Sequence, residues 1–140
     1  LYIQVQQMRF GDKIQYIENL APHSNSIHIV HFSLQPLVEN AIIHGLEPML
    51  GQGTLELSST FSGKDLLIKI QDNGVGINPE QVQQLRDYLE ESSNTLTEEH
   101  IGLKNVHEQI RYYFGNKYGV TIASVLGEGT TLTVRIPALS

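Results

Sequence analysis

One aspartate of the chain, Asp72, stands where a strand-like segment gives way to a glycine-rich loop, in KIQDNGVGI (residues 69–77). The residues before it alternate between apolar and polar, which places its carboxylate on the same face as the two preceding isoleucines. A carboxylate on an apolar face costs free energy unless it meets a hydrogen-bond donor. Asp72 therefore either caps the turn that follows, or forms the floor of a pocket and accepts a hydrogen bond from a ligand. In the second case Gly74 and Gly76 let the backbone pass close to that ligand.

A second group of polar side chains lies on LQPLVENAIIHG (residues 34–45), which predicts an amphipathic helix that Gly45 ends. At about 100° per residue, Asn40 and His44 lie side by side at one edge of the apolar stripe, and Glu39 lies beyond the other edge. The three side chains are either solvated on an ordinary amphipathic helix or part of a binding site.

Two further segments have the same double interpretation. In IGLKN (residues 101–105), Gly102 precedes a helix start whose free N–H groups suit a phosphate, and Lys104 adds a positive charge. The alternative is an ordinary loop-to-helix junction. In GEGTTLTV (residues 127–134), the hydroxyl of Thr130 points inward with the apolar side chains of its strand. The alternative there is a hairpin turn followed by a threonine-rich strand.

Composition and missing motifs exclude several classes of protein. Fifteen Asp and Glu against nine Lys and Arg leave a net charge of −6, which argues against a nucleic-acid surface. The chain has no cysteine, and its six histidines are scattered, which argues against a disulfide framework and a zinc site. It contains neither GxxxxGK[ST] nor GxGxxG after a strand, so the P-loop and Rossmann interpretations fail. No apolar run is long enough to cross a membrane.

The order of the elements predicts how these segments are brought together. Strands are expected at residues 13–18, 54–61, 65–72, 120–125 and 130–137, and helices at 34–44, 79–91 and 103–114. Neighbouring strands favour antiparallel pairing, and the helices need one sheet face to pack on. The predicted fold class is α/β, a two-layer sandwich with a mixed sheet of about five strands and helices on one face. We interpret residues 1–12 as a linker or helix from a preceding dimerisation segment of a longer protein, and residues 13–140 as one domain.

Taken together and in this order, the four segments resemble the motifs of the GHKL superfamily of ATP-binding domains, found in gyrase-type ATPases, Hsp90, histidine kinases and MutL. LVENAIIHG resembles the N box, DNGVGI the G1 box, IGLKN the G2 box and GEGT the G3 box, and the match covers about residues 33–137. The leading IQVQQMRFGDKIQY and the segment GLKNVHEQI are similar to sensor histidine kinases of the LytS/YesM-like kind. The resemblance implies the Bergerat fold, in which ATP binds between sheet and helices beneath a mobile lid, here residues 78–101.

The resemblance also implies roles for individual residues. Asp72 would accept a hydrogen bond from the adenine amino group, with Thr130 nearby through a water. Asn40 would hold Mg²⁺, and Glu39 would be catalytic, orienting or polarising the nucleophile. The full set of implied nucleotide-binding residues is Asn40, His44, Asp72, Gly74, Gly76, Ile77, Gly102, Leu103, Lys104 and Thr130.

The implied function is that of the ATP-binding catalytic domain of a sensor histidine kinase. Such a domain transfers the γ-phosphoryl group of ATP to a histidine on a dimerisation segment, for relay to a response regulator. The whole protein would be a membrane-anchored homodimer with this domain in the cytoplasm. The acceptor segment is not recognisable in these 140 residues, so we expect no autophosphorylation by the chain alone.

Three alternatives remain open: a serine kinase of the anti-sigma-factor type, a GHL-type ATPase, and a nucleotide-binding module without turnover. Two positions depart from relatives. Ile43 stands where lysine is common, and His100 stands where many relatives have a further lid glycine.

Overall fold

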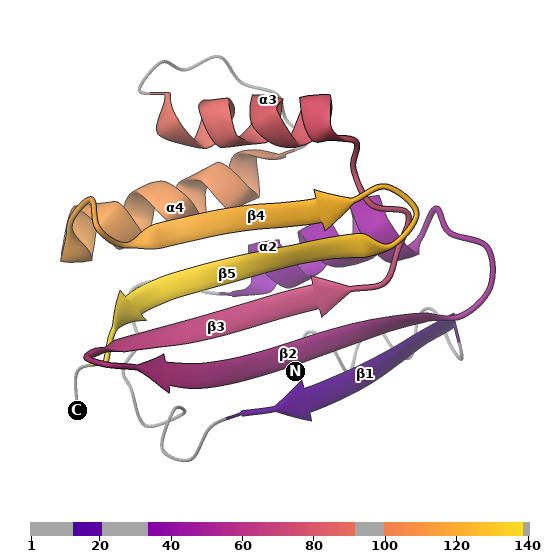
Figure 1. The fold of residues 1–140 in the computed structure, drawn as a ribbon, viewed down its shortest axis with the longest axis horizontal. Coiled ribbons are helices and arrows are strands. Elements are labelled where there is room, and N and C mark those ends of the chain that lie inside the picture. The colour runs from indigo at the N-terminus through magenta and orange to yellow at the C-terminus, as the bar shows by residue number, and fades with distance from the viewer. Residues whose placement is uncertain (1–12, 21–33, 92–99, 139–140) are drawn as a thin grey trace.

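The computed structural model describes residues 13–20, 34–91 and 100–138. Five strands form one mixed sheet in the order β1-β2-β3-β5-β4 (Figure 1). The strands are β1 (Ile14–Asn19), β2 (Gly53–Ser62), β3 (Asp65–Asp72), β4 (Gly119–Val125) and β5 (Gly129–Pro137). β1 runs parallel to β2, and every other neighbouring pair is antiparallel. The predicted mixed sheet of about five strands is confirmed.

Helical segments cover one face of this sheet, so the predicted two-layer arrangement is also confirmed. They are α2 (Gln35–Asn40), η3 (Ala41–Leu46), α3 (Pro79–Glu90) and α4 (Ile101–Phe114). In β3, Ile68, Ile70 and Asp72 are buried, whereas Lys69 and Gln71 between them are exposed. This alternation shows that one face of the sheet meets the helices and that Asp72 points to that face, as its position in the strand predicts.

The first helical segment departs from the prediction that Gly45 ends it. The α-helical turn stops at Asn40, and the chain continues as a π-helical segment, η3, in which Gly45 is buried. The Glu47 N–H group donates to the Ile42 carbonyl at 2.8 Å, the wider spacing of a π-helix. The Gly45 carbonyl accepts from the Val75 N–H group at 3.0 Å. The wide turn therefore lies where the loop after β3 approaches the helix.

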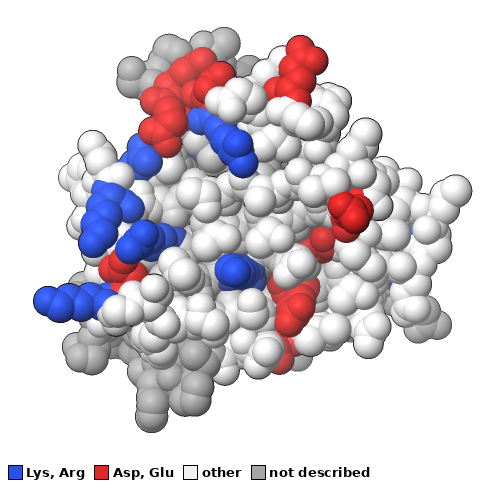
Figure 2. Space-filling view, in the orientation of Figure 1, with Lys and Arg blue, Asp and Glu red and all other residues white. Residues whose placement is uncertain are grey.

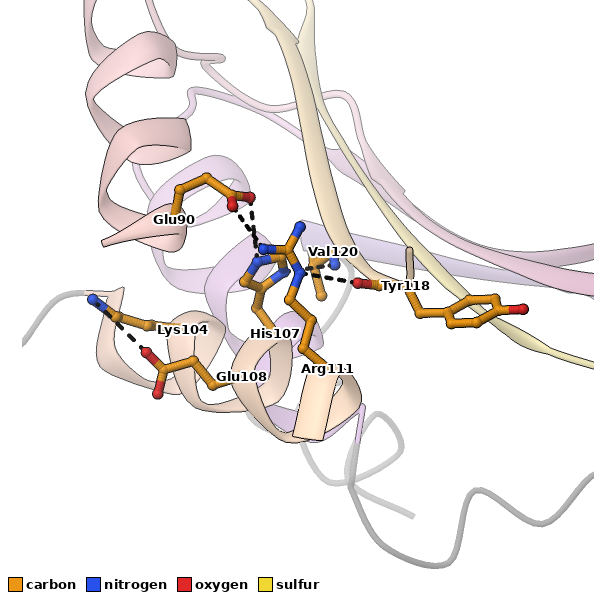
Figure 3. A network of polar contacts seen from close by, with 7 residues as sticks. All are labelled: Glu90, Lys104, His107, Glu108, Arg111, Tyr118 and Val120. Carbon is orange, nitrogen blue, oxygen red and sulfur yellow. Dashed lines mark hydrogen bonds and ion pairs between the residues drawn. The ribbon is translucent and has the colours of Figure 1, made fainter. Parts of the chain in front are cut away.

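A polar network joins the end of α3 to α4 and to the start of β4 (Figure 3). Arg111 on α4 donates to Glu90, the last residue of α3, at 2.6 Å, and to the Tyr118 carbonyl at 3.1 Å. The Val120 N–H group donates to Nδ1 of His107, which is 2% exposed, at 2.9 Å. The network thus fixes α3 and α4 against the same edge strand. The intervening segment, residues 92–99, belongs to the predicted lid and lies outside the described residues.

The two ends of the sheet differ in charge. On the face shown in Figure 2, Lys and Arg gather toward the left, where β3 begins and β5 ends. Arg135 donates to Asp65 at this end, at 2.7 Å. Asp72 stands at the opposite end of β3. Among residues 13–20, 34–91 and 100–138, no helix has the length and apolar character needed to span a bilayer.

Candidate nucleotide-binding site

Asp72 is a deeply buried charged group of the predicted site. It is 4% exposed and pairs directly across the sheet with Thr130, so two of the predicted site residues are neighbours. The Gly74 N–H group donates to its Oδ1 at 2.8 Å. Burial raises the pKa of Asp72 to about 6, and hydrogen bonds from the backbone of Gly74 and Thr130 act in the opposite direction. Burial of this carboxylate lowers the stability of the folded chain. Its presence here therefore favours a role in ligand binding.

Two glycines allow the elements around Asp72 to come together. A Cβ atom at Gly45 would lie 2.6 Å from Asp72 Oδ1, and a Cβ atom at Gly74 would lie 2.1 Å from the Gly45 carbonyl oxygen. Only glycine fits at either position without displacing its neighbour. The sequence motifs predict Gly74 as a site residue but give Gly45 only the role of a helix end. Gly45 lies five residues after Asn40, and this spacing does not predict a contact with Asp72.

A first cavity of about 400 Å³ opens beside the loop that follows Asp72. Its lining combines apolar and polar side chains: His44, Gly76, Ile77, Gln81, Gln84, Leu85, Tyr88 and His100. Its volume and mixed lining suit a small ligand with both apolar and polar parts. Asp72 is not among the lining residues, because its carboxylate is covered by Gly45 and Gly74 in this conformation.

Ser124 on β4 connects the loop that follows Asp72 to the turn before β5 by hydrogen bonds. Its hydroxyl accepts from the Ile77 N–H group at 2.9 Å and donates to the Gly129 carbonyl at 2.8 Å. Because that bond uses its only proton, the Thr130 hydroxyl at 2.8 Å must be the donor toward Ser124. The lone pairs of the Thr130 hydroxyl oxygen can then accept a further hydrogen bond. Sequence reasoning missed Ser124, which carries no motif signal.

A second cavity, of about 540 Å³, collects four other predicted residues. It is lined by Pro36, Glu39, Asn40, Ile43, His44, Ile101, Gly102 and Leu103. The N-terminus of α4 therefore faces the same space as Glu39 and Asn40, as a phosphate or metal site requires. His44 lines both cavities, which places it between them.

Lys104 lines neither cavity, although it contacts Tyr88, which lines the first. Its Nζ is 4.4 Å from the centroid of the Tyr88 ring and 3.9 Å from Glu108 Oε1 (Figure 3 shows the pair with Glu108). The ammonium group thus joins α4 to α3 in this conformation. Its predicted role as a phosphate cation stays a prediction.

His100 contacts the predicted metal ligand. Nδ2 of Asn40 lies 3.1 Å from Nδ1 of His100, and the His44 and His100 ring centroids are 4.9 Å apart. In the sequence, position 100 stands out only as a departure from a lid glycine. Because Asn40 and His100 are 60 positions apart, the sequence does not predict this contact.

Solved structures of histidine kinases share this fold. The histidine kinase domain of the blue-light activated histidine kinase from Erythrobacter litoralis EL346 superposes with a TM-score of 0.63 at 16% identity, covering 98% of this chain and 57% of that one. The catalytic domain of the histidine kinase ThkA gives a TM-score of 0.63 at 13% identity, covering 98% of this chain and 88% of that one. At these identities the likeness defines the class of fold, that of a histidine kinase ATPase domain.

The sequence identifies the family. The family described as histidine kinase-, DNA gyrase B- and HSP90-like ATPase matches residues 26–140, and the chain belongs to this family of ATP-binding domains. The sensor histidine kinase YpdA of Escherichia coli K12 is 35% identical over 136 residues, which cover 97% of this chain and 22% of YpdA. The chain thus spans about a fifth of the length of this relative. The GHKL resemblance is confirmed, and the finer LytS/YesM-like assignment stays a prediction.

The described residues fit the ligands of this family. For ATP, they offer a buried acceptor at Asp72 and an apolar wall that includes Ile77 and Leu85. For Mg²⁺, Glu39 and Asn40, which both carry side-chain oxygens, line the cavity at the start of α4. Within the part of the chain that the structure describes, His, Asp and Glu do not gather in groups of three or more that could hold a metal ion. A metal ion here would take its other ligands from phosphate and water, as Mg²⁺ commonly does.

Proposed function

We propose that this chain is the catalytic, ATP-binding domain of a two-component sensor histidine kinase, which moves the γ-phosphoryl group of ATP to a histidine on a dimerisation segment. The relay would continue to a response regulator. The whole protein would be a membrane-anchored homodimer with this domain in the cytoplasm, residues 1–12 as the linker, and residues 92–99 in the lid. The similarity to sensor histidine kinases supports the proposal.

The observation that carries the proposal is the buried carboxylate of Asp72. Its pKa of about 6 leaves it mostly ionised at neutral pH, so it serves as a hydrogen-bond acceptor. The adenine amino group is a donor at the matching position, whereas guanine presents a carbonyl oxygen there. The acceptor oxygen of Thr130, directly opposite on β5, would hold a water against the same base edge.

The second cavity supplies the surroundings for the phosphates. The N–H groups of Gly102 and Leu103, in the first turn of α4, would bind phosphate oxygens. The Asn40 carboxamide would hold Mg²⁺, His44 would contact the phosphates between the two cavities, and Glu39 would orient the incoming imidazole. When bound, ATP supplies the phosphoryl group and Mg²⁺ neutralises its developing charge. The chain's own contribution is position and electrostatics.

Nucleotide binding tests the site. We expect ATP with Mg²⁺ at a hundred times its Kd to stabilise the chain by about 2.7 kcal/mol, seen as a rise of several degrees in Tm. A carbonyl oxygen against a buried carboxylate costs roughly 1–3 kcal/mol, so GTP should bind at least about tenfold more weakly. Equal affinity for the two nucleotides would refute the role of Asp72.

Phosphoryl transfer tests the class of enzyme. The chain joined to the segment that precedes it in the whole protein should form acid-labile phosphohistidine from labelled ATP, and Glu39→Gln should slow this step more than it weakens ATP binding. Acid-stable phosphoserine on a partner would support the serine kinase, and release of inorganic phosphate alone would support the GHL-type ATPase. Binding without either reaction would leave a nucleotide-binding module.

A further inference from the structure

His100 connects two elements that are distant in sequence, at the boundary between the two cavities. It directly precedes α4 and lines the first cavity, whereas Asn40, at the end of α2, lines the second. Nδ1 of His100 and Nδ2 of Asn40 are 3.1 Å apart. The ring of His44, which lines both cavities, lies beside His100 at 4.9 Å between centroids. The contact between His100 and Asn40 therefore joins a residue of the first cavity to a residue of the second.

The hydrogen bond between Asn40 Nδ2 and His100 Nδ1 runs in one direction. An amide nitrogen can only donate a hydrogen bond, so Nδ1 of His100 must accept, which places the proton of the neutral ring on Nε2. With Nδ2 of Asn40 engaged, its Oδ1 is left for another partner, and Asn40 lines the second cavity. Oxygen is the atom that a hard cation such as Mg²⁺ takes as a ligand. If the amide flipped, Oδ1 would require a proton on Nδ1 of His100, and the metal would meet the NH₂ donor.

Helix capping does not explain His100. The residue occupies the N-cap position of α4 but makes no side-chain hydrogen bond to the first turn of the helix. Its side chain instead reaches across to Asn40. His100 thus contributes to the site through its ring nitrogen Nδ1 and not by capping α4.

We propose that His100 is a positioning residue, which holds the Asn40 carboxamide with its oxygen toward the Mg²⁺ of bound MgATP. The inference rests on the proposed function, because it takes Asn40 as the metal ligand. It adds to the metal site a residue that lies 60 positions from Asn40 in the sequence and within the predicted lid, residues 78–101. Partners of metal ligands typically change metal affinity by about 10- to 100-fold when removed.

Two substitutions distinguish the contribution of the Nδ1 acceptor from that of the aromatic ring. His100→Phe keeps an aromatic ring beside His44 but removes the acceptor. His100→Asn places an amide oxygen at the same distance from Cβ as Nδ1, so it restores the acceptor without the ring. His100→Leu serves as a second acceptor-free variant if the phenylalanine variant does not fold.

The first measurement needs no nucleotide. In ¹⁵N-labelled protein, the side-chain NH₂ signals of Asn40, assigned by their loss in Asn40→Asp, should shift in His100→Phe and stay near their wild-type positions in His100→Asn. Unchanged signals in His100→Phe would show that the hydrogen bond does not exist in solution and would overturn the proposal.

The second measurement is calorimetric titration with ATP, in a series of Mg²⁺ concentrations and in EDTA. We expect His100→Phe to need about tenfold more Mg²⁺ for half of the metal-dependent gain in affinity, with its affinity in EDTA unchanged and His100→Asn within about threefold of wild type. The same Mg²⁺ dependence in His100→Phe as in wild type, or an equal loss in EDTA, would overturn the positioning role alone. Wild-type protein that binds no ATP under any condition would overturn the proposed function and this role together.

Discussion

The Asp72 carboxylate lies against the backbone of Gly45, so closely that a Cβ atom at Gly45 would come 2.6 Å from Asp72 Oδ1. The two residues belong to the end of β3 and to η3. The Val75 N–H group closes the contact by donating to the Gly45 carbonyl. The loop after β3 and the helical segment that follows Asn40 are therefore packed together. A substitution of Gly45 should therefore weaken nucleotide binding, although Gly45 lines neither cavity.

Substitution of Gly45 by alanine tests this unit. The added Cβ must displace the Asp72 carboxylate, so we expect Gly45→Ala to weaken ATP binding at least tenfold, and to lower the free energy of unfolding by about 1–3 kcal/mol through overpacking. Titration calorimetry and urea unfolding measure the two effects. Gly63→Ala is the control, because Gly63 has φ +61° and a Cβ atom added there would meet no described atom within 4 Å. It should cost about 1–2 kcal/mol of backbone strain and leave ATP binding intact.

The raised pKa of Asp72 makes the stability of the chain depend on pH. Its carboxyl group has an ordinary pKa of 3.8 and one of about 6 in the fold, so between these values the folded chain binds the proton more tightly than the unfolded chain. The contribution of this group to stability is then lost as pH rises through that window. We expect Asp72→Asn, which cannot titrate, to gain stability relative to wild type by up to roughly 3 kcal/mol between pH 4 and pH 6.5.

Denaturant unfolding at a series of pH values measures this difference. The same variant should bind ATP much more weakly at every pH, because the amide replaces one of the two acceptor oxygens with an NH₂ donor while the Gly74 N–H group engages the other oxygen. A pH-independent difference between Asp72→Asn and wild type would contradict the burial argument. An ATP affinity equal to that of wild type would contradict the base-binding role.

Ser124 should couple the two loops that border the first cavity. Ser124→Ala leaves the Ile77 N–H group without its acceptor and removes the partner of the Thr130 hydroxyl. We expect a loss of about 1–3 kcal/mol in the free energy of unfolding, together with weaker ATP binding. A double-mutant cycle with Thr130→Val should give a coupling energy of about 0.5–3 kcal/mol. Thr133→Ala, on the more exposed face of β5, should change neither quantity, and strictly additive effects of Ser124→Ala and Thr130→Val would contradict the coupling.

His107 should make the chain less stable in acid. Burial, followed by the charge of Arg111, lowers its pKa below the ordinary 6.5, against the opposing charges of Glu90 and Glu108. As pH falls below 6.5 the unfolded chain takes up the proton first, so stability declines from there toward the folded pKa. His107→Asn keeps an acceptor for the Val120 N–H group but does not titrate in this range. Its free energy of unfolding should fall less steeply than that of wild type as pH decreases below 6.5, and a slope equal to that of wild type would contradict this assignment.

Local patterns were enough to predict the class of the fold. The alternation around Asp72 fixes its face because side chains alternate along a strand whatever the strand packs against. The pairing of Asp72 with Thr130 brings together two residues whose inward direction was readable from their own strands. Glu39, Asn40, Gly102 and Leu103 were likewise named from the motifs, and the structure places them around one cavity.

The tertiary structure decided the features that depend on contacts between distant segments. The π-helical turn at Gly45 follows from the approach of the loop at Val75, so the glycine signal that predicts a helix end was wrong there. Ser124 and His100 enter the site through partners 47 and 60 positions away, and Lys104 turns toward Tyr88 and Glu108. Periodicity reports the face on which a side chain lies, because it is set by backbone geometry within one element. Which atom that side chain meets is set by the packing of whole elements, and only the folded chain contains that information.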